Sequence, residues 1–65
     1  MKTTVNGIER EVTAATVDEL LAQLDVARDG VAVALNDRVV RRADYATARL
    51  LDGDSVEIVR AVAGG

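Results

Sequence analysis

The sequence contains no cysteine, no histidine and no proline, and Tyr45 is its only aromatic residue. Without cysteine and histidine, the chain has no Ser-His or Cys-His catalytic pair and no usual zinc ligands, so we expect no bound metal. No thiol is present that would carry sulfur on a side chain. The absence of cysteine also fits a reducing compartment, and we expect a cytoplasmic protein.

Positive charge is also scarce, because eight lysine and arginine residues stand against eleven acidic residues, which gives a net charge of −3. With one aromatic ring to stack on a base, this balance argues against nucleic acid as a partner. No apolar run approaches the ~20 residues that cross a bilayer, so no membrane partner is expected. At 65 residues the chain is expected to form a single domain over 1–65.

Residues 1–13 predict a β-hairpin. Asn6-Gly7 is a strong signal for a two-residue type I′ turn, since both residues tolerate the positive φ that this turn requires. The turn sets the register and pairs Val5 with Ile8. It also pairs Thr3 with Arg10 on the same face, where Arg10 is the one charged residue.

A short helix is expected next. Thr16 and Glu19 form a capping box at its start. Apolar residues then recur at i, i+3, i+4 and i+7 and predict one buried stripe: Val17, Leu20, Leu21 and Leu24. The stripe ends at Leu24, which limits the helix to about two turns.

The second half predicts three strands. Residues 31–35 form the first, and Asn36-Asp37 turns into a short second strand through Val39 and Val40. Residues 43–48 are expected to form a helical turn in which Tyr45 covers the end of the core. A turn at 52–54 leads to the last strand, 55–59. The order is β-β-α-β-β-β, an α+β fold in which one helix packs on one face of a mixed sheet.

This order, at this length, resembles the β-grasp fold of ubiquitin, in which the first and last strands lie side by side in the middle of the sheet. The chain closes on Gly64-Gly65 soon after its last strand, as the ubiquitin-like sulfur carriers of bacteria do. Three further segments make it most similar to the sulfur carrier family of thiamine biosynthesis: Asn6-Gly7, Ala15-Thr16-Val17 with Leu20-Leu21, and Val31-Ala32-Val33 with Asn36. The resemblance covers essentially the whole chain.

Two positions depart from the family pattern. Asp37 stands where relatives often have glycine, and Ala63 stands where they often have a third terminal glycine. The small subunit of molybdopterin synthase shares the fold and the tail, but its phenylalanine and proline before Gly-Gly have no counterpart here. The residues leave open a ubiquitin-like modifier that is attached to lysines, and a non-covalent β-grasp binding module with an inert tail.

The resemblance implies a protein co-substrate rather than an enzyme, with no bound cofactor. An adenylating (E1-like) enzyme would consume ATP to activate the carboxylate of Gly65, and a sulfurtransferase or cysteine desulfurase would supply sulfur, leaving a thiocarboxylate. Thiazole synthase would then take the sulfur for thiazole formation. Residues 62–65 are expected to be a flexible tail, in which Ala63 and Gly64 precede the modified residue, since glycine has the most backbone freedom.

Alternation along the strands predicts a docking surface. If Val33, Leu35, Val56 and Ile58 face the helix, the residues between them face the other way. That second face is then apolar with small side chains, which is unusual for a free-standing sheet: Ala32, Ala34, Val59 and Ala61, with Arg60 flanking them. We expect this face to contact a partner.

Overall fold

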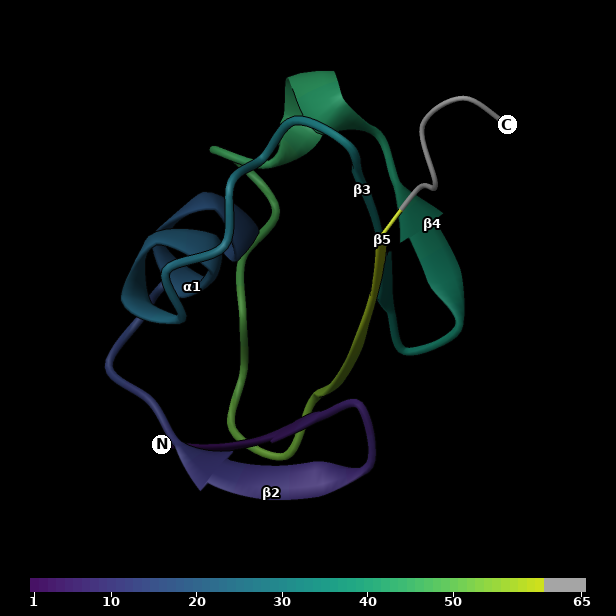
Figure 1. The fold of residues 1–65 in the computed structure, drawn as a ribbon. Helices are drawn as coiled ribbons and strands as arrows, with labels where there is room; N and C mark the ends of the chain where they lie inside the picture. Colours follow the sequence, from purple (N-terminus) through teal and green to yellow (C-terminus); the bar gives the residue numbers. More distant parts are fainter. Residues whose placement is uncertain (61–65) are drawn as a thin grey trace.

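The computed structural model describes residues 1–60 of the chain and shows one five-stranded sheet with a helix across one face (Figure 1). The order of strands in the sheet is β2-β1-β5-β3-β4. Along the chain the elements are β1 (Lys2–Val5), β2 (Ile8–Glu11), α1 (Val17–Gln23), β3 (Val31–Leu35), β4 (Arg38–Val40), the 3-10 helix η1 (Arg42–Asp44) and β5 (Ser55–Arg60). The predicted β-β-α-β-β-β order is confirmed. No helix among residues 1–60 is long and apolar enough to cross a bilayer.

The β1–β2 hairpin has the predicted turn and register. Asn6 and Gly7 both have positive φ, at 50° and 81°, as a type I′ turn requires. Val5 pairs with Ile8, and Thr3 pairs with Arg10. Because side chains alternate across a strand, this register places Val5 and Thr3 in the core.

Helix α1 begins at the predicted cap. The backbone N–H of Glu19 donates to the Thr16 hydroxyl at 3.2 Å. The Glu19 carboxylate accepts from the N–H of Ala15 at 3.2 Å, one residue before the cap residue that a capping box would use. Leu24 lies just after the helix and is half-buried, so the buried stripe ends where the helix does.

Residues 41–50 bring the chain back to the start of α1. The predicted helical turn exists, but it begins one residue earlier, as η1 (Arg42–Asp44), and Tyr45 is buried as expected. The carbonyls of Tyr45 and Ala48 accept the N–H groups of Asp18 and Val17, at 2.9 and 3.0 Å. These are two of the N–H groups that every helix leaves without a partner in its first turn, so this segment completes the helix start.

Strand β5 lies in the middle of the sheet, parallel to β1 on one side and antiparallel to β3 on the other. The central parallel pair of first and last strands, implied by the β-grasp resemblance, is confirmed. The face of the sheet that packs against α1 is called the inner face, and the opposite one the outer face. The buried core fills the space between the inner face and α1: Val5, Val12, Ala14, Val17, Leu20, Leu21, Val33, Tyr45, Leu50 and Val56.

Thr3 is the exception in this core. Its side chain points to the inner face and is 1% exposed, and its hydroxyl has no hydrogen-bond partner among the described residues. A buried hydroxyl without a partner loses its hydrogen bonds to water and regains nothing on folding. Thr3 therefore lowers the stability of the folded state relative to an apolar residue of the same shape.

Replacing Thr3 with valine keeps the shape of the side chain and removes the unpaired hydroxyl. We expect Thr3→Val to raise the free energy of unfolding by about 1 kcal/mol, measured by urea denaturation. Thr4→Val is the matched control on the outer face, where we expect a change within about 0.5 kcal/mol. A loss of stability in Thr3→Val would mean that its hydroxyl is hydrogen-bonded in solution.

Candidate functional site

The predicted reactive end lies outside the described residues. Ala61, Ala63, Gly64 and Gly65 all belong to this part of the chain. The structure describes the strand that leads to them, β5, up to its last residue Arg60. The geometry of the site is therefore the geometry of β5, its attachments and the two faces that it presents.

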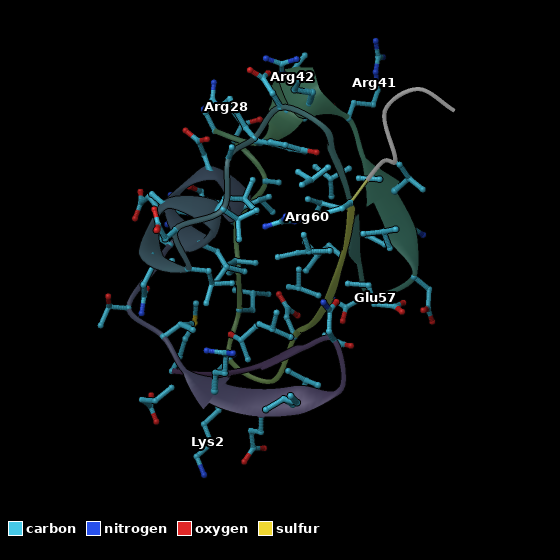
Figure 2. The ribbon with its side chains drawn as sticks, viewed as in Figure 1. Lys2, Arg28, Arg41, Arg42, Glu57 and Arg60 are labelled. Atoms are coloured by element: carbon cyan, nitrogen blue, oxygen red, sulfur yellow. The ribbon has the colours of Figure 1, made fainter. Side chains whose placement is uncertain are left out.

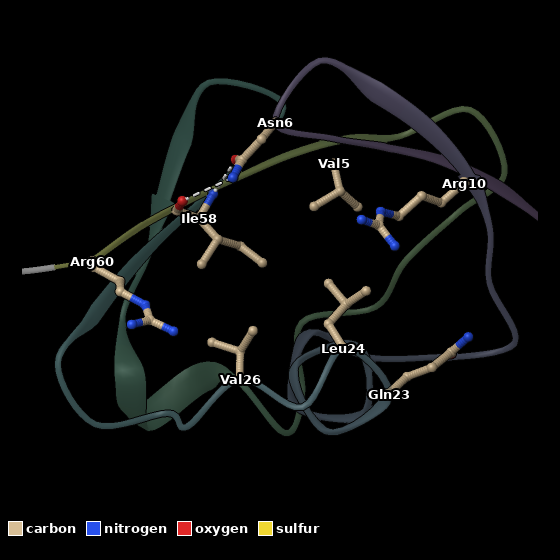
Figure 3. A pocket seen from close by; sticks show the side chains of 8 residues that line it. All are labelled: Val5, Asn6, Arg10, Gln23, Leu24, Val26, Ile58 and Arg60. Carbon is tan, nitrogen blue, oxygen red and sulfur yellow. Dashed lines mark hydrogen bonds between the residues drawn. The ribbon is translucent and has the colours of Figure 1, made fainter.

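One of these attachments is the side chain of Asn6, which holds β5 near its end. The N–H of Ile58 donates to Asn6 Oδ1 at 2.7 Å, and Asn6 Nδ2 donates to the Ile58 carbonyl at 3.1 Å (Figure 3). Paired strand residues end at Val5 on β1 and Val56 on β5. The amide group thus stands in for one more backbone residue of β1 and extends the pairing by two residues of β5.

A second asparagine holds the beginning of β5 from the other side. The N–H of Ser55 donates to Asn36 Oδ1 at 2.9 Å, and the backbone N–H of Asn36 donates to the Ser55 carbonyl at 2.7 Å. Asn36 Nδ2 also donates to the Asp54 carboxylate at 2.9 Å. Like Asn6, Asn36 has a positive φ, 51°, and is the first residue of a two-residue turn.

Both turns were predicted from the sequence, but the roles of their asparagine side chains were not. The available signal was that each turn begins with asparagine, whose amide both donates and accepts a hydrogen bond. Aspartate or glycine would also have suited the backbone of the turn. The two amides fix β5 at Ser55 and Ile58, and so fix the strand from which residues 61–65 continue.

The outer face carries an apolar patch close to where it was predicted. Ala32 lies opposite Val59, and Ala34 lies opposite Val39 on the next strand. Val39 and Val59 are 78% and 61% exposed. Together with Glu57 these side chains line a shallow hollow of about 210 Å³. The outer patch is defined as Ala32, Ala34, Val39 and Val59.

Two residues of this region were missed. The position of Val39 could have been predicted, because a two-residue turn at Asn36-Asp37 places it directly opposite Ala34. Glu57 lies between the inward-facing residues Val56 and Ile58, so its position on the outer face could also have been predicted from the sequence. It is the only charged side chain that lines the hollow among residues 1–60.

The prediction that Arg60 flanks the outer patch was wrong. Arg60 is paired with Val31 and lies two residues after Ile58, so alternation turns it to the inner face. Figure 2 shows Arg60 directed toward α1 and Glu57 directed to the other side of β5. Arg60 instead lines a cavity with Val26 and Ile58 (Figure 3).

The acidic turn before β5 has a structural role. An Asp52 carboxylate oxygen accepts from the N–H of Lys2 at 2.6 Å, and Asp54 accepts from the N–H of Leu51 at 2.8 Å. Within residues 1–60, no three acidic, histidine or cysteine residues come together as a metal would require. The Asp52 carboxylate therefore holds this turn against the start of β1, and the Asp54 carboxylate closes the turn.

Comparisons with known proteins agree on one family. A model of the ThiS family matches residues 3–65. The sulfur carrier protein ThiS of Escherichia coli is 42% identical over 50 residues, covering 77% of this chain and 76% of that protein. The corresponding protein of Thermus thermophilus is 36% identical over 61 residues, covering 94% and 95%.

A longer relative and a solved structure extend this finding. A thiazole synthase of Paramagnetospirillum magneticum is 42% identical over 66 residues, which cover 100% of this chain but only 20% of that protein. The crystal structure of the thiamine biosynthesis protein ThiS from Geobacter metallireducens superposes with a TM-score of 0.85 at 39% identity, covering 100% of both chains. The chain thus matches three ThiS proteins over most of their length and a thiazole synthase over about a fifth.

The hydrogen bonds between Asn6 and Ile58 generate a prediction. Asn6→Asp keeps the acceptor and loses the donor, and Asn6→Gly loses both while still tolerating the positive φ. We expect the free energy of unfolding to fall by about 1 kcal/mol in Asn6→Asp and by about 2 kcal/mol in Asn6→Gly. Amide hydrogen exchange at Ile58 should accelerate beyond what global unfolding explains, with Leu21 in α1 as the internal control. Equal protection at Ile58 in all three proteins would contradict this.

Proposed function

This chain belongs to the ThiS family of sulfur carrier proteins of thiamine biosynthesis, and from this premise we propose that it carries sulfur as a thiocarboxylate on Gly65. The observation that carries the proposal is the Gly64-Gly65 end, five residues after the central strand, in a sequence without cysteine. With no thiol among the 65 residues, the main-chain carboxylate is the group left to hold sulfur.

The proposed reaction has three steps, each performed by a partner. In an adenylating enzyme, an oxygen of the Gly65 carboxylate attacks the α-phosphorus of ATP, and pyrophosphate leaves. A persulfide sulfur from a sulfurtransferase or cysteine desulfurase then attacks the carbonyl carbon, and AMP leaves. A thiol reduces the resulting acyl disulfide and releases the thiocarboxylate. ATP is thus consumed by the partner and is not a cofactor of this chain.

Activation is needed because a free carboxylate is ionised at neutral pH and is a poor electrophile. Two glycines suit this chemistry, since the lack of Cβ allows a partner's backbone to close around them and leaves the carbonyl carbon open to attack. Thiazole synthase is the proposed acceptor of the sulfur. A thiazole synthase that contains a segment similar to this whole chain supports that pairing.

We assign the outer patch to the adenylating enzyme. The four apolar side chains of the outer patch lie on the sheet that contains β5, and two of them are large and exposed. A contact here would hold β5, and with it the start of residues 61–65, against the enzyme. Binding energy from this non-reacting surface would position the carboxylate for attack, which is the general use of remote contacts in enzyme reactions.

Variants that change the length of the end test the reaction. Deleting Gly65 leaves the terminus one residue, ~3.3 Å of extended chain, short of the reacting position. A misplacement of about 1 Å can cost 10²-fold in rate. We expect ATP–pyrophosphate exchange with the adenylating enzyme to fall by at least that factor, both on deletion and on addition of one residue after Gly65. Exchange that survives the deletion would place the reaction elsewhere.

A charge on the outer patch tests the docking surface. Val59→Glu puts a carboxylate where the free protein has solvent and the complex has an apolar contact. We expect kcat/KM for adenylation to fall about tenfold or more while Tm stays near the wild-type value. Leu51→Glu is the matched control, because Leu51 is 69% exposed but does not line the hollow of the outer patch. Equal losses in both variants, or none in either, would remove the outer patch from the docking surface.

A further inference from the structure

A second hollow lies on the other side of β5, between the inner face and the end of α1 (Figure 3). Its volume is about 500 Å³, within the range of ligand-binding clefts. The helix-side groove is defined as this hollow, with the lining Val5, Asn6, Arg10, Gln23, Leu24, Val26, Ile58 and Arg60. Four of these side chains are aliphatic, and Leu24, Val26 and Ile58 are only partly buried, so the groove offers apolar surface that the core leaves uncovered.

Two arginines stand at opposite ends of the helix-side groove, with the aliphatic side chains between them (Figure 3). Both are exposed, Arg10 on β2 and Arg60 at the end of β5. Within residues 1–60, the arginines that form ion pairs are Arg28 with Asp18 and Arg42 with Asp29, and neither groove arginine has such a pair. In the part of the chain that the structure describes, no acidic residue contributes to the lining.

This distribution of charge is unusual for the chain. The protein is acidic overall, with a net charge of −3, yet the residues among 1–60 that line this groove present two guanidinium groups and no carboxylate. Arg10 occupies the inner face of β2, where its partner Thr3 is buried in the core. An apolar residue in place of Arg10 would have extended the core. Packing alone therefore does not explain a guanidinium group at this position.

The arrangement also limits the shape of a ligand. Strand β1 separates β2 from β5, which places the two arginines about 10 Å apart across the sheet. Arg10 is level with Asp54, six residues before Arg60, so their backbones are also about 20 Å apart along the strands. A single small anion would engage one guanidinium, whereas an elongated ligand with two negative groups would engage both. The aliphatic side chains between them would contact an apolar middle section.

We propose that the helix-side groove binds an extended acidic segment of a partner protein, in which carboxylates flank apolar side chains. The carboxylates would pair with Arg10 and Arg60, and the apolar residues would cover Leu24, Val26 and Ile58. The helix-side groove and the outer patch lie on opposite faces of the sheet, so two partners would bind at the same time, one on each face. Binding here requires no chemistry at Gly65 and is independent of the thiocarboxylate reaction.

The test uses the full-length protein and a synthetic probe. The probe is an acetylated and amidated peptide in which aspartates flank a short run of valines, and its control carries asparagines in place of the aspartates. Titration is followed by amide chemical shifts in ¹H–¹⁵N NMR spectra. We expect saturable shifts at Gln23, Leu24, Val26 and Ile58, and binding at least tenfold weaker for the asparagine peptide.

Variants of the two arginines measure how much each one contributes to binding of the aspartate peptide. Arg10→Gln and Arg60→Gln should each raise Kd about threefold, the size of effect that exposed ion pairs give, and the double variant about tenfold. Arg38→Gln is the matched control, because Arg38 is exposed on β4 and does not line the groove. Binding should also weaken as salt rises.

Four results would overturn the proposal. They are the absence of saturable shifts, shifts confined to the outer patch, equal binding of the asparagine peptide, and equal binding of a dicarboxylate without valines, such as glutarate. The last result would indicate a small anion as the ligand. The comparison of the two peptides needs only the wild-type protein, so it decides the question even where a variant unfolds. Failure here would leave the adenylation experiments unaffected.

Discussion

Hydrogen bonds on both edges of β5 are the constraint on which the rest of the structure depends. The strand is paired with β1 and β3, and the side chains of Asn6 and Asn36 continue this pairing beyond the point where the neighbouring strands turn away. Val56 contributes the middle of the core from this strand. Because β5 is held at Ser55 and Ile58, it stays paired between β1 and β3. The position from which residues 61–65 continue is therefore fixed as well.

The same strand contributes residues to both proposed recognition surfaces, one on each face of the sheet. Alternation sends Val59 and Glu57 to the outer face and Ile58 and Arg60 to the inner one. The outer patch is apolar with one acid beside it, and the helix-side groove is apolar with two cations at its ends. A small carrier has little surface to offer, and opposite chemistry on the two faces would let different partners recognise it without competing for one site.

Much of this was predictable from the sequence because the signals are local. The Asn6-Gly7 turn fixed the hairpin register, the Thr16 cap fixed the helix start, and period two fixed the faces of β3 and β5. The asparagine contacts were not predictable in the same way, because Asn6 and Ile58 are 52 residues apart and meet only when β1 and β5 pair. Arg60 was predicted to flank the outer patch, but alternation turns consecutive residues to opposite faces, so Arg60 lies on the inner face while Val59 lies on the outer one. The proposed reactive end lies outside residues 1–60, and its proposed role rests on the family rather than on packing.

The most direct test of the central claim is the mass of the protein after reaction. The purified chain is incubated with ATP, its adenylating enzyme, a persulfide donor and a thiol, and its intact mass is measured together with that of its C-terminal fragment. The account predicts a gain equal to the difference between a sulfur and an oxygen atom, located on Gly65 and dependent on ATP. An unchanged mass under conditions in which the enzyme exchanges pyrophosphate, or a gain located on any other residue, would contradict it.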